Sequence, residues 1–100
     1  MHIISKSTLK DFWSQHPAAE TALTAWHKQM AVANYANLAE LKQTFASADI
    51  VGNLTVFNIG GNKFRLIALI DYKYQKVFIR AVLTHEEYDQ DKWKKDPWFN

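Results

Sequence analysis

The chain has 100 residues, 48% of them apolar, with no cysteine and a formal net charge of +2. This length and composition predict one compact domain over residues 1–100, and they exclude a disordered segment, a disulfide framework and a thiolate metal site. No apolar run approaches the ~18 residues of a membrane span, and the opening MHIISKSTLKDFW lacks the apolar stretch of a secretory signal. We therefore expect a soluble, cytoplasmic protein without membrane association.

Residues 1–46 have the pattern of a short strand followed by three helices. MHII predicts the strand, and apolar residues at helical spacing follow Ser5 and Ser7, either of which suits the N-cap. Pro17 interrupts this helix and opens the next. The second helix has an apolar stripe made of Ala19, Ala22, Leu23, Trp26, Met30 and Ala33. A third short helix is predicted for NLAELKQTF, residues 37–45, with its apolar side facing the core.

Beyond these helices the apolar period changes to two, which predicts three strands: LTVFNI, KFRLIALIDY and KVFIRAVL. Gly60-Gly61 suits a two-residue hairpin turn that needs positive φ, and this turn would place Val56 opposite Arg65. The next turn, of two or four residues, places Asp71 opposite Lys76 in either case. Continuing that register puts Arg65 opposite Val82 and Ile67 opposite Arg80.

This register gives the sheet two different faces. The face expected to pack on the helices holds Phe57, Phe64, Leu66, Ala68, Ile70, Ile79, Ala81 and Leu83. The opposite face mixes polar and apolar side chains: Asn58, Lys63, Arg65, Arg80 and Thr84 with Val56, Ile67, Leu69, Phe78 and Val82. The expected class is therefore α+β, with N-terminal helices on one face of a small antiparallel sheet.

The polar face carries cations that suit a phosphate. Arg65 and Arg80 would be diagonal neighbours, and the guanidinium fork favours bidentate contacts with such anions. The basic surplus also lies in residues 61–100, with eight Lys or Arg against six Asp or Glu. An ordinary solvated face is the simpler interpretation, but the exposed apolar residues among the cations indicate a bound partner.

After the last strand, Thr84 and Glu87 have the spacing of a capping box, which predicts a short helix. His85 would lie in its first turn, where backbone donors also favour a phosphate, and Tyr88 one turn beyond Thr84. Neither His85 nor Arg65 is expected to be a core group. The remaining histidines show no metal-ligand spacing.

Together these groups suit RNA cleavage by the RNA's own 2′-hydroxyl. That reaction needs a base for the 2′-hydroxyl, an acid for the leaving 5′-oxygen and positive charge against the phosphorane. His and Tyr can move the protons, while Arg and Lys can stabilise the charge. The reaction requires no metal ion or other cofactor.

Residues 56–89, VFNIGGNKFRLIALIDYKYQKVFIRAVLTHEEYD, resemble the HigB-type toxins of the RelE superfamily, and the opening MHIISKSTLKDFWSQHP also fits that family. The resemblance implies a RelE-like fold and an endoribonuclease that cleaves mRNA on the translating 70S ribosome, independently of metal. It further implies a HigA-type helix-turn-helix antitoxin as partner, with operator DNA contacted only through that antitoxin.

The same resemblance implies the site residues. We expect His85 and Tyr88 to transfer protons, and Lys63, Arg65 and Arg80 to bind the scissile phosphate. The RNA-binding residues are expected to be Asn62, Lys63, Arg65, Lys76, Arg80 and Lys92. Relatives differ in which residue is acid and which is base, so these two roles stay open.

Two other interpretations remain open on the residues alone. The basic face could bind RNA or the ribosome without cutting, or the chain could be an inactive homologue kept for complex formation with its antitoxin. In the tail QDKWKKDPWFN, three aromatic residues either pack on the domain or stack on RNA or a partner. These are Trp93, Trp98 and Phe99.

Overall fold

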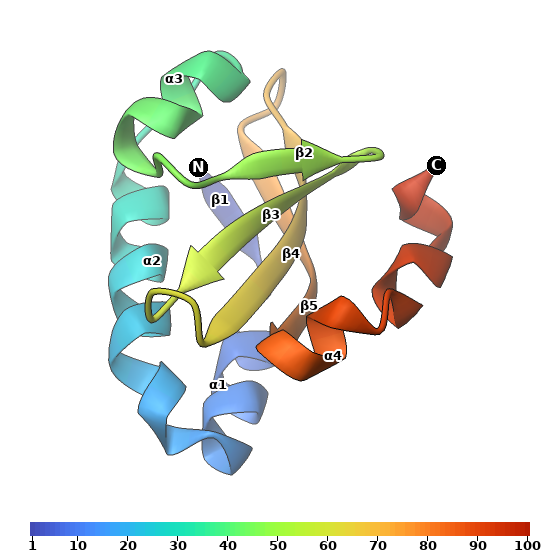
Figure 1. The fold of residues 1–100 in the computed structure, drawn as a ribbon. Helices are drawn as coiled ribbons and strands as arrows, with labels where there is room; N and C mark the ends of the chain where they lie inside the picture. The colour runs from blue at the N-terminus through green and yellow to red at the C-terminus, as the bar shows by residue number, and fades with distance from the viewer.

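The computed structural model describes residues 1–100 as a five-stranded sheet with helices on one face and the C-terminal segment on the other (Figure 1). The strands are β1 (His2–Ile4), β2 (Asp49–Val51), β3 (Leu54–Ile59), β4 (Phe64–Asp71) and β5 (Lys76–Thr84). The α-helices are α1 (Lys6–Gln15), α2 (Glu20–Val32), α3 (Leu38–Thr44) and α4 (His85–Asp89). Three 3-10 helices are η1 (Pro17–Ala19), η2 (Lys92–Lys95) and η3 (Pro97–Phe99). The predicted α+β class is confirmed, and no helix has the length and apolar character needed to cross a bilayer.

The strand order is β1-β5-β4-β3-β2, with β1 parallel to β5 and the other pairs antiparallel. The predicted antiparallel pairing of the three central strands is therefore confirmed, and the first strand lies at one edge of the sheet. The sequence does not predict β2, which has only three residues and joins β3 through a tight turn. That turn depends on Gly52, whose φ of +61° is readily adopted only by glycine.

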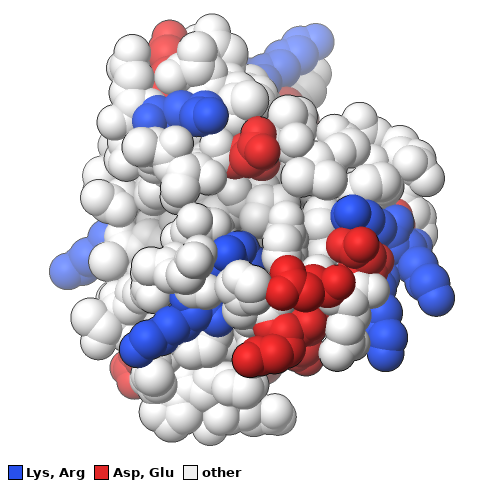
Figure 2. Space-filling view, in the orientation of Figure 1, with Lys and Arg blue, Asp and Glu red and all other residues white.

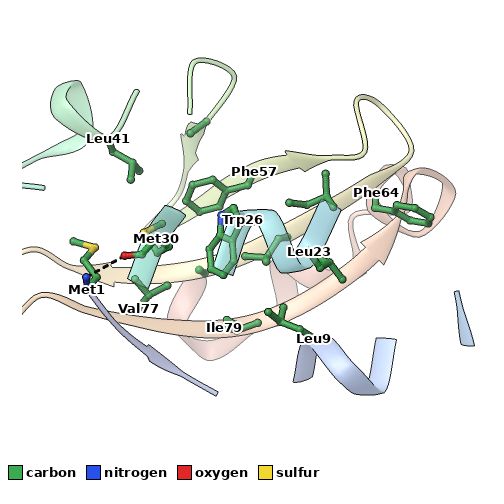
Figure 3. Packing of buried hydrophobic residues seen from close by; sticks show 14 of the residues in the cluster. Met1, Leu9, Leu23, Trp26, Met30, Leu41, Phe57, Phe64, Val77 and Ile79 are labelled. Carbon is green, nitrogen blue, oxygen red and sulfur yellow. Dashed lines mark hydrogen bonds between the residues drawn. The ribbon is translucent and has the colours of Figure 1, made fainter. Parts of the chain in front are cut away.

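The main core lies between the helices and one face of the sheet (Figure 3). The predicted stripe of α2 supplies Leu23, Trp26 and Met30, which are all buried. Trp26 meets Phe57 of β3 edge to face, with ring centroids 5.4 Å apart. Each fully buried side chain of this size stabilises the fold by roughly 1.5–3 kcal/mol. This packing fixes the helices against one face of the sheet and leaves the other face to the C-terminal segment.

The β3–β4 hairpin differs from its prediction in length but not in the faces that it presents. Its loop has four residues, 60–63, so Asn58 pairs with Arg65 and Ile59 with Phe64. The expected two-residue turn at Gly60-Gly61, and with it the Val56–Arg65 pair, is wrong. Because the register moves by two residues, side-chain parity is preserved. Phe64 therefore packs on the helices while Arg65 lies on the outer face, as predicted.

The β4–β5 hairpin contains a bulge that the sequence does not predict. Asp71 pairs with Lys76 as expected, but Ala68 pairs with Ile79 and Ile67 with Ala81, which leaves Arg80 unpaired. One extra residue reverses parity along the rest of β5. The predicted faces of the residues beyond the bulge are therefore wrong. Ala81 and Leu83 pack on the outer face, Val82 packs on the helix side, and Thr84 pairs with Phe64, which also faces the helices.

The outer face of the sheet is covered by the chain's own C-terminal segment, residues 90–100. Trp93 is only 8% exposed and packs with Leu54, Val56 and Ile67. Trp98 packs edge to face on Phe78, with ring centroids 5.5 Å apart. Of the two alternatives that the sequence leaves open for these aromatic residues, the structure shows packing on the domain. The expectation of an exposed apolar patch on this face is wrong, because the tail occupies it.

Candidate functional site

The helix α4 and the β3–β4 loop meet at one end of the sheet. The backbone N–H of Glu87 donates to the Thr84 hydroxyl at 3.2 Å, and the backbone N–H of Thr84 donates to the Glu87 carboxylate at 2.9 Å. This is the predicted capping box, and it starts α4 directly after β5. The backbone N–H of His85 then donates to the Lys63 carbonyl at 3.1 Å, which ties the helix to the loop.

Arg65 lies beneath this junction. It is only 7% exposed, so the expectation that it lies outside the packed interior is wrong. Its Nη1 donates to the Phe64 carbonyl at 3.0 Å and its Nη2 to Asn62 Oδ1 at 2.9 Å. The burial follows from α4, which brings the Tyr88 ring centroid to 5.4 Å from the guanidinium carbon. Two of the five N–H donors of a guanidinium suffice for these bonds, so others are left for an anion.

Tyr88 is held from both sides. One face of its ring meets Arg65, and the ring stacks on Trp93 with centroids 5.3 Å apart and an interplanar angle of 13°. Trp93 Nε1 also donates to the Tyr88 carbonyl at 3.1 Å. The ring is therefore locked in place, while its hydroxyl has no hydrogen-bond partner within the protein.

His85 and Lys63 complete the group. The His85 ring is 43% exposed, and its Nδ1 lies 2.9 Å from Asp89 Oδ2. Lys63 is exposed and forms no ion pair. Basic side chains gather beside the β3–β4 loop and along the C-terminal segment, with acidic side chains over α4 between them (Figure 2). The acidic residues of α4 are Glu86, Glu87 and Asp89, so the group combines cations with a carboxylate border.

Arg80 lies in different surroundings. Its Nε donates to Asp96 Oδ2 at 2.8 Å and its Nη2 to Asp96 Oδ1 at 3.1 Å, while its guanidinium carbon lies 3.9 Å from the Trp98 ring centroid. The hydrogen bonds from Arg80 lower the pKa of the Asp96 carboxyl, aided by the backbone N–H of Trp98 and against the effect of burial. The fork of Arg80 is thus already occupied by a carboxylate of the tail.

The two lysines predicted to bind RNA lie in different places. Lys76 begins β5 and pairs with Asp71, whereas His85 follows the other end of that nine-residue strand. At ~3.3 Å per residue this separates Lys76 from the site by roughly 25 Å. Lys92 opens η2, is exposed, and follows α4 closely in the chain.

The structure thus brings together Asn62, Lys63, Arg65, His85 and Tyr88, and leaves Arg80 and Lys76 outside this group. Two residues of these surroundings were not predicted from the sequence: Trp93 as a wall of the site and Asp96 as the partner of Arg80. The Asp96-Pro97 pair is a helix-start signal that could have indicated an ordered tail. The group lies on an open surface, without a cavity. No three His, Cys, Asp or Glu side chains gather in an arrangement suited to a metal ion.

Comparison with known proteins connects this surface to a family. The family of HigB toxins, described as the RelE-like toxic component of a toxin-antitoxin system, matches residues 19–91. The mRNA interferase toxin HigB of Escherichia coli K12 is 38% identical over 92 residues, which cover 89% of this chain and 88% of the relative. The mRNA interferase HigB of Shigella flexneri matches equally well. The mRNA interferase HigB of Escherichia coli O6:H1 is 27% identical over 93 residues, 90% of each chain.

Proposed function

The chain belongs to the HigB family, the RelE-like toxic components of toxin–antitoxin systems, and from that premise we propose that it is an endoribonuclease that cleaves mRNA and so inhibits translation. The observation that carries the proposal is the arrangement around Arg65. A largely buried guanidinium with unused donors lies beside a fixed phenol. An imidazole and a free lysine belong to the same junction of α4 with the β3–β4 loop.

The proposed reaction is attack of the 2′-oxygen of a nucleotide on its own 3′-phosphorus. The P–O5′ bond breaks, leaving a 2′,3′-cyclic phosphate on one fragment and a 5′-hydroxyl on the other. His85 and Tyr88 transfer the two protons, one from the 2′-hydroxyl and one to the 5′-oxygen. Arg65 and Lys63 stabilise the negative charge that develops on the phosphorane. Every group that transfers a proton or stabilises charge in this scheme is a side chain of the protein, so the chemistry needs no cofactor.

The remaining predicted RNA-binding residues have supporting roles in this proposal. Asn62 orients Arg65, to which it is hydrogen bonded. Arg80 acts indirectly, because its contact with Asp96 holds the tail that carries Trp93 against Tyr88. Lys92 is close enough along the chain to α4 to meet the RNA backbone near the site. Lys76 could meet RNA only several nucleotides from the scissile phosphate.

We propose that cleavage depends on the 70S ribosome and therefore occurs in the cytoplasm. A flexible single strand has to be ordered before its 2′-oxygen aligns with the phosphorus. The structure contains no pocket that would enclose such a strand. A ribosome holds mRNA in a defined path, which supplies that order.

The proposed partner in the cell is a HigA-type helix-turn-helix antitoxin. Its binding to the junction of α4 and the β3–β4 loop, or beside it, would silence the toxin. Contact with operator DNA is then made by the antitoxin alone. Co-expression with a helix-turn-helix protein encoded beside this chain should relieve growth arrest, and the isolated chain should leave operator DNA unshifted in a gel.

The cleavage test uses programmed ribosomes, with primer extension to detect new 5′ ends. The unmutated protein should generate them on ribosome-bound mRNA and far fewer on free mRNA. Tyr88→Phe keeps the ring between Arg65 and Trp93 and removes only the hydroxyl. It should slow cleavage by about 10²–10⁴, the contribution of a positioned acid or base. Lys10→Ala, on the exposed side of α1, is the matched control and should cleave normally.

Other outcomes would decide against the proposal. Arrest of translation without new 5′ ends would indicate a binding module that blocks the ribosome. Failure to arrest growth on induction, with a stable antitoxin complex, would indicate an inactive homologue. Full activity in Tyr88→Phe would remove Tyr88 from the chemistry.

A further inference from the structure

The motif THEEYD contains two residues that neither the fold nor the proposed chemistry uses, Glu86 and Asp89. Thr84 and Glu87 form the capping box, and His85 and Tyr88 are assigned to proton transfer. Asp89 has neither role. Its Oδ2 lies 2.9 Å from Nδ1 of His85, one helical turn away, where residues i and i+4 share a face. The neighbouring carboxylate, Glu86, is exposed and makes no hydrogen bond or ion pair.

The contact determines how the imidazole presents its two nitrogens. A carboxylate oxygen carries only lone pairs, so at 2.9 Å it favours a proton on the facing Nδ1 over a second lone pair there. The neutral ring then carries its lone pair on Nε2. The backbone of His85 is fixed as well, because its N–H donates to the Lys63 carbonyl. Both the main chain and the ring of His85 are therefore oriented.

We propose that Asp89 is a positioning residue that holds His85 in the Nδ1–H tautomer, so that Nε2 is the atom that exchanges protons with RNA. This assignment rests on the proposed function for its catalytic part. In that part, Nε2 takes the proton of the 2′-hydroxyl or, already protonated, gives one to the 5′-oxygen. The competing explanation is an ordinary surface pair, since the two side chains are 43% and 60% exposed. An exposed pair adds little to stability, so the two explanations separate cleanly in experiment.

The first test measures the tautomer in the isolated protein. Long-range ¹H–¹⁵N correlation spectra, recorded at a pH where histidines are neutral, distinguish Nδ1–H from Nε2–H. The unmutated chain should show the Nδ1–H form for His85. Asp89→Ala should shift the ring toward Nε2–H. Glu86→Gln removes the same charge from the same helix without touching the ring, and it should leave the tautomer unchanged.

The second test measures single-turnover cleavage at saturating programmed ribosomes. Asp89→Ala should slow it about tenfold, the lower end of what orienting partners of metal-bound histidines contribute. Asp89→Glu should recover part of the rate, and Glu86→Gln should retain all of it. In a His85→Ala background, Asp89→Ala should cause no further loss, because the two residues act through one group. Thermal melts of all variants should coincide.

The results overturn the proposal in distinguishable ways. An unchanged tautomer in Asp89→Ala would refute the positioning role, whatever the activity. A changed tautomer with an unchanged rate would leave Asp89 without a catalytic consequence and refute that part. If the unmutated protein does not cleave at all, the proposed function fails, and the spectra alone decide whether Asp89 orients His85.

Discussion

Arg65 combines two demands that usually exclude one another, a buried position and a charge offered to a ligand. Its guanidinium is satisfied on one side by Asn62 and the Phe64 carbonyl and is covered by Tyr88. A buried cation without such partners would be strongly destabilising. The partners therefore allow the charge to be preorganised near the proposed scissile phosphate, which is more effective than a charge that must first be ordered.

Arg65→Ala should consequently reduce both stability and activity. The change leaves Asn62 Oδ1 without its donor and opens space under Tyr88, which should cost about 1–3 kcal/mol in the free energy of unfolding. Cleavage should fall by roughly 10²–10³. Urea denaturation and single-turnover assays measure the two effects. A variant that is as stable and as active as the parent would show that the guanidinium has neither role.

Lys63→Ala should separate these effects, because Lys63 is exposed and has no side-chain partner. Its melting temperature should be unchanged, while cleavage should fall by up to the ~10²–10³ of a single charge-stabilising donor. Lys10→Ala on α1 removes the same charge from another exposed position and should alter neither. A lower melting temperature for Lys63→Ala alone would show that the lysine is structural.

The sequence predicts which face of the sheet a side chain takes only where side chains alternate regularly along the strand. Phe64 and Arg65 were assigned to the correct opposite faces, because a two-residue error in the length of the β3–β4 loop leaves the alternation unchanged. The bulge at Arg80 reverses the alternation along β5. The stretch KVFIRAVL contains no glycine or proline that would predict this bulge. The burial of Arg65 was also beyond the pattern, since it depends on where α4 folds after β5.

At the scale of elements, the site is an assembly of a loop, a strand end and a short helix, completed by the tail. The five-residue α4 is too short to persist alone. Its capping box, the bond from His85 to Lys63 and the stacking of Tyr88 on Trp93 hold it in place. The capping box could be predicted from a motif of four residues. The contact with Trp93 could not, because the apolar residues of the tail have neither helical nor strand periodicity.

Trp93→Ala tests that assembly. Trp93 is 8% exposed among Leu54, Val56 and Ile67, and truncating a buried tryptophan typically costs about 3–5 kcal/mol. Loss of the stack should also free the Tyr88 ring, so cleavage should fall even at temperatures where the variant is folded. Trp98→Ala is the matched control, because Trp98 is 38% exposed and contacts Arg80 and Phe78 rather than Tyr88. Equal effects of the two changes on cleavage would contradict a specific role for Trp93.

At the scale of the whole molecule, the sheet is packed on both faces by one chain. The N-terminal helices build the larger core, and the C-terminal segment seals the outer face through Trp93, the Arg80–Asp96 pair and Phe99. Phe99 approaches the β2–β3 turn so closely that its carbonyl accepts from the Asn53 N–H at 2.8 Å. The helical half was predictable because its apolar stripes are long and periodic. The tail was not, because short 3-10 turns leave no periodic signal.

Two titrating groups make this packing sensitive to acid, one on each side of the sheet. Burial, with a smaller effect of the Lys6 charge, lowers the pKa of His27 from its ordinary 6.5. The unfolded chain therefore binds a proton here before the folded one, so stability should start to fall as the pH drops below 6.5. On the other side, the hydrogen bonds from Arg80 lower the pKa of Asp96 from 3.8. Its contribution is complete above 3.8 and is lost as the pH falls through the lower folded value.

Melting temperatures recorded against pH should therefore decline in two stages, which single substitutions can assign. His27→Gln removes the first titration, so its stability should be flat where the parent begins to decline near pH 6.5. Asp96→Asn removes the second and leaves Arg80 with a neutral partner, so it should be less stable than the parent at neutral pH. That difference should shrink as the pH falls below 3.8, because the parent then loses the same charge. A difference that stays constant down to the lowest pH would mean that Asp96 holds the tail by its shape and not by its charge.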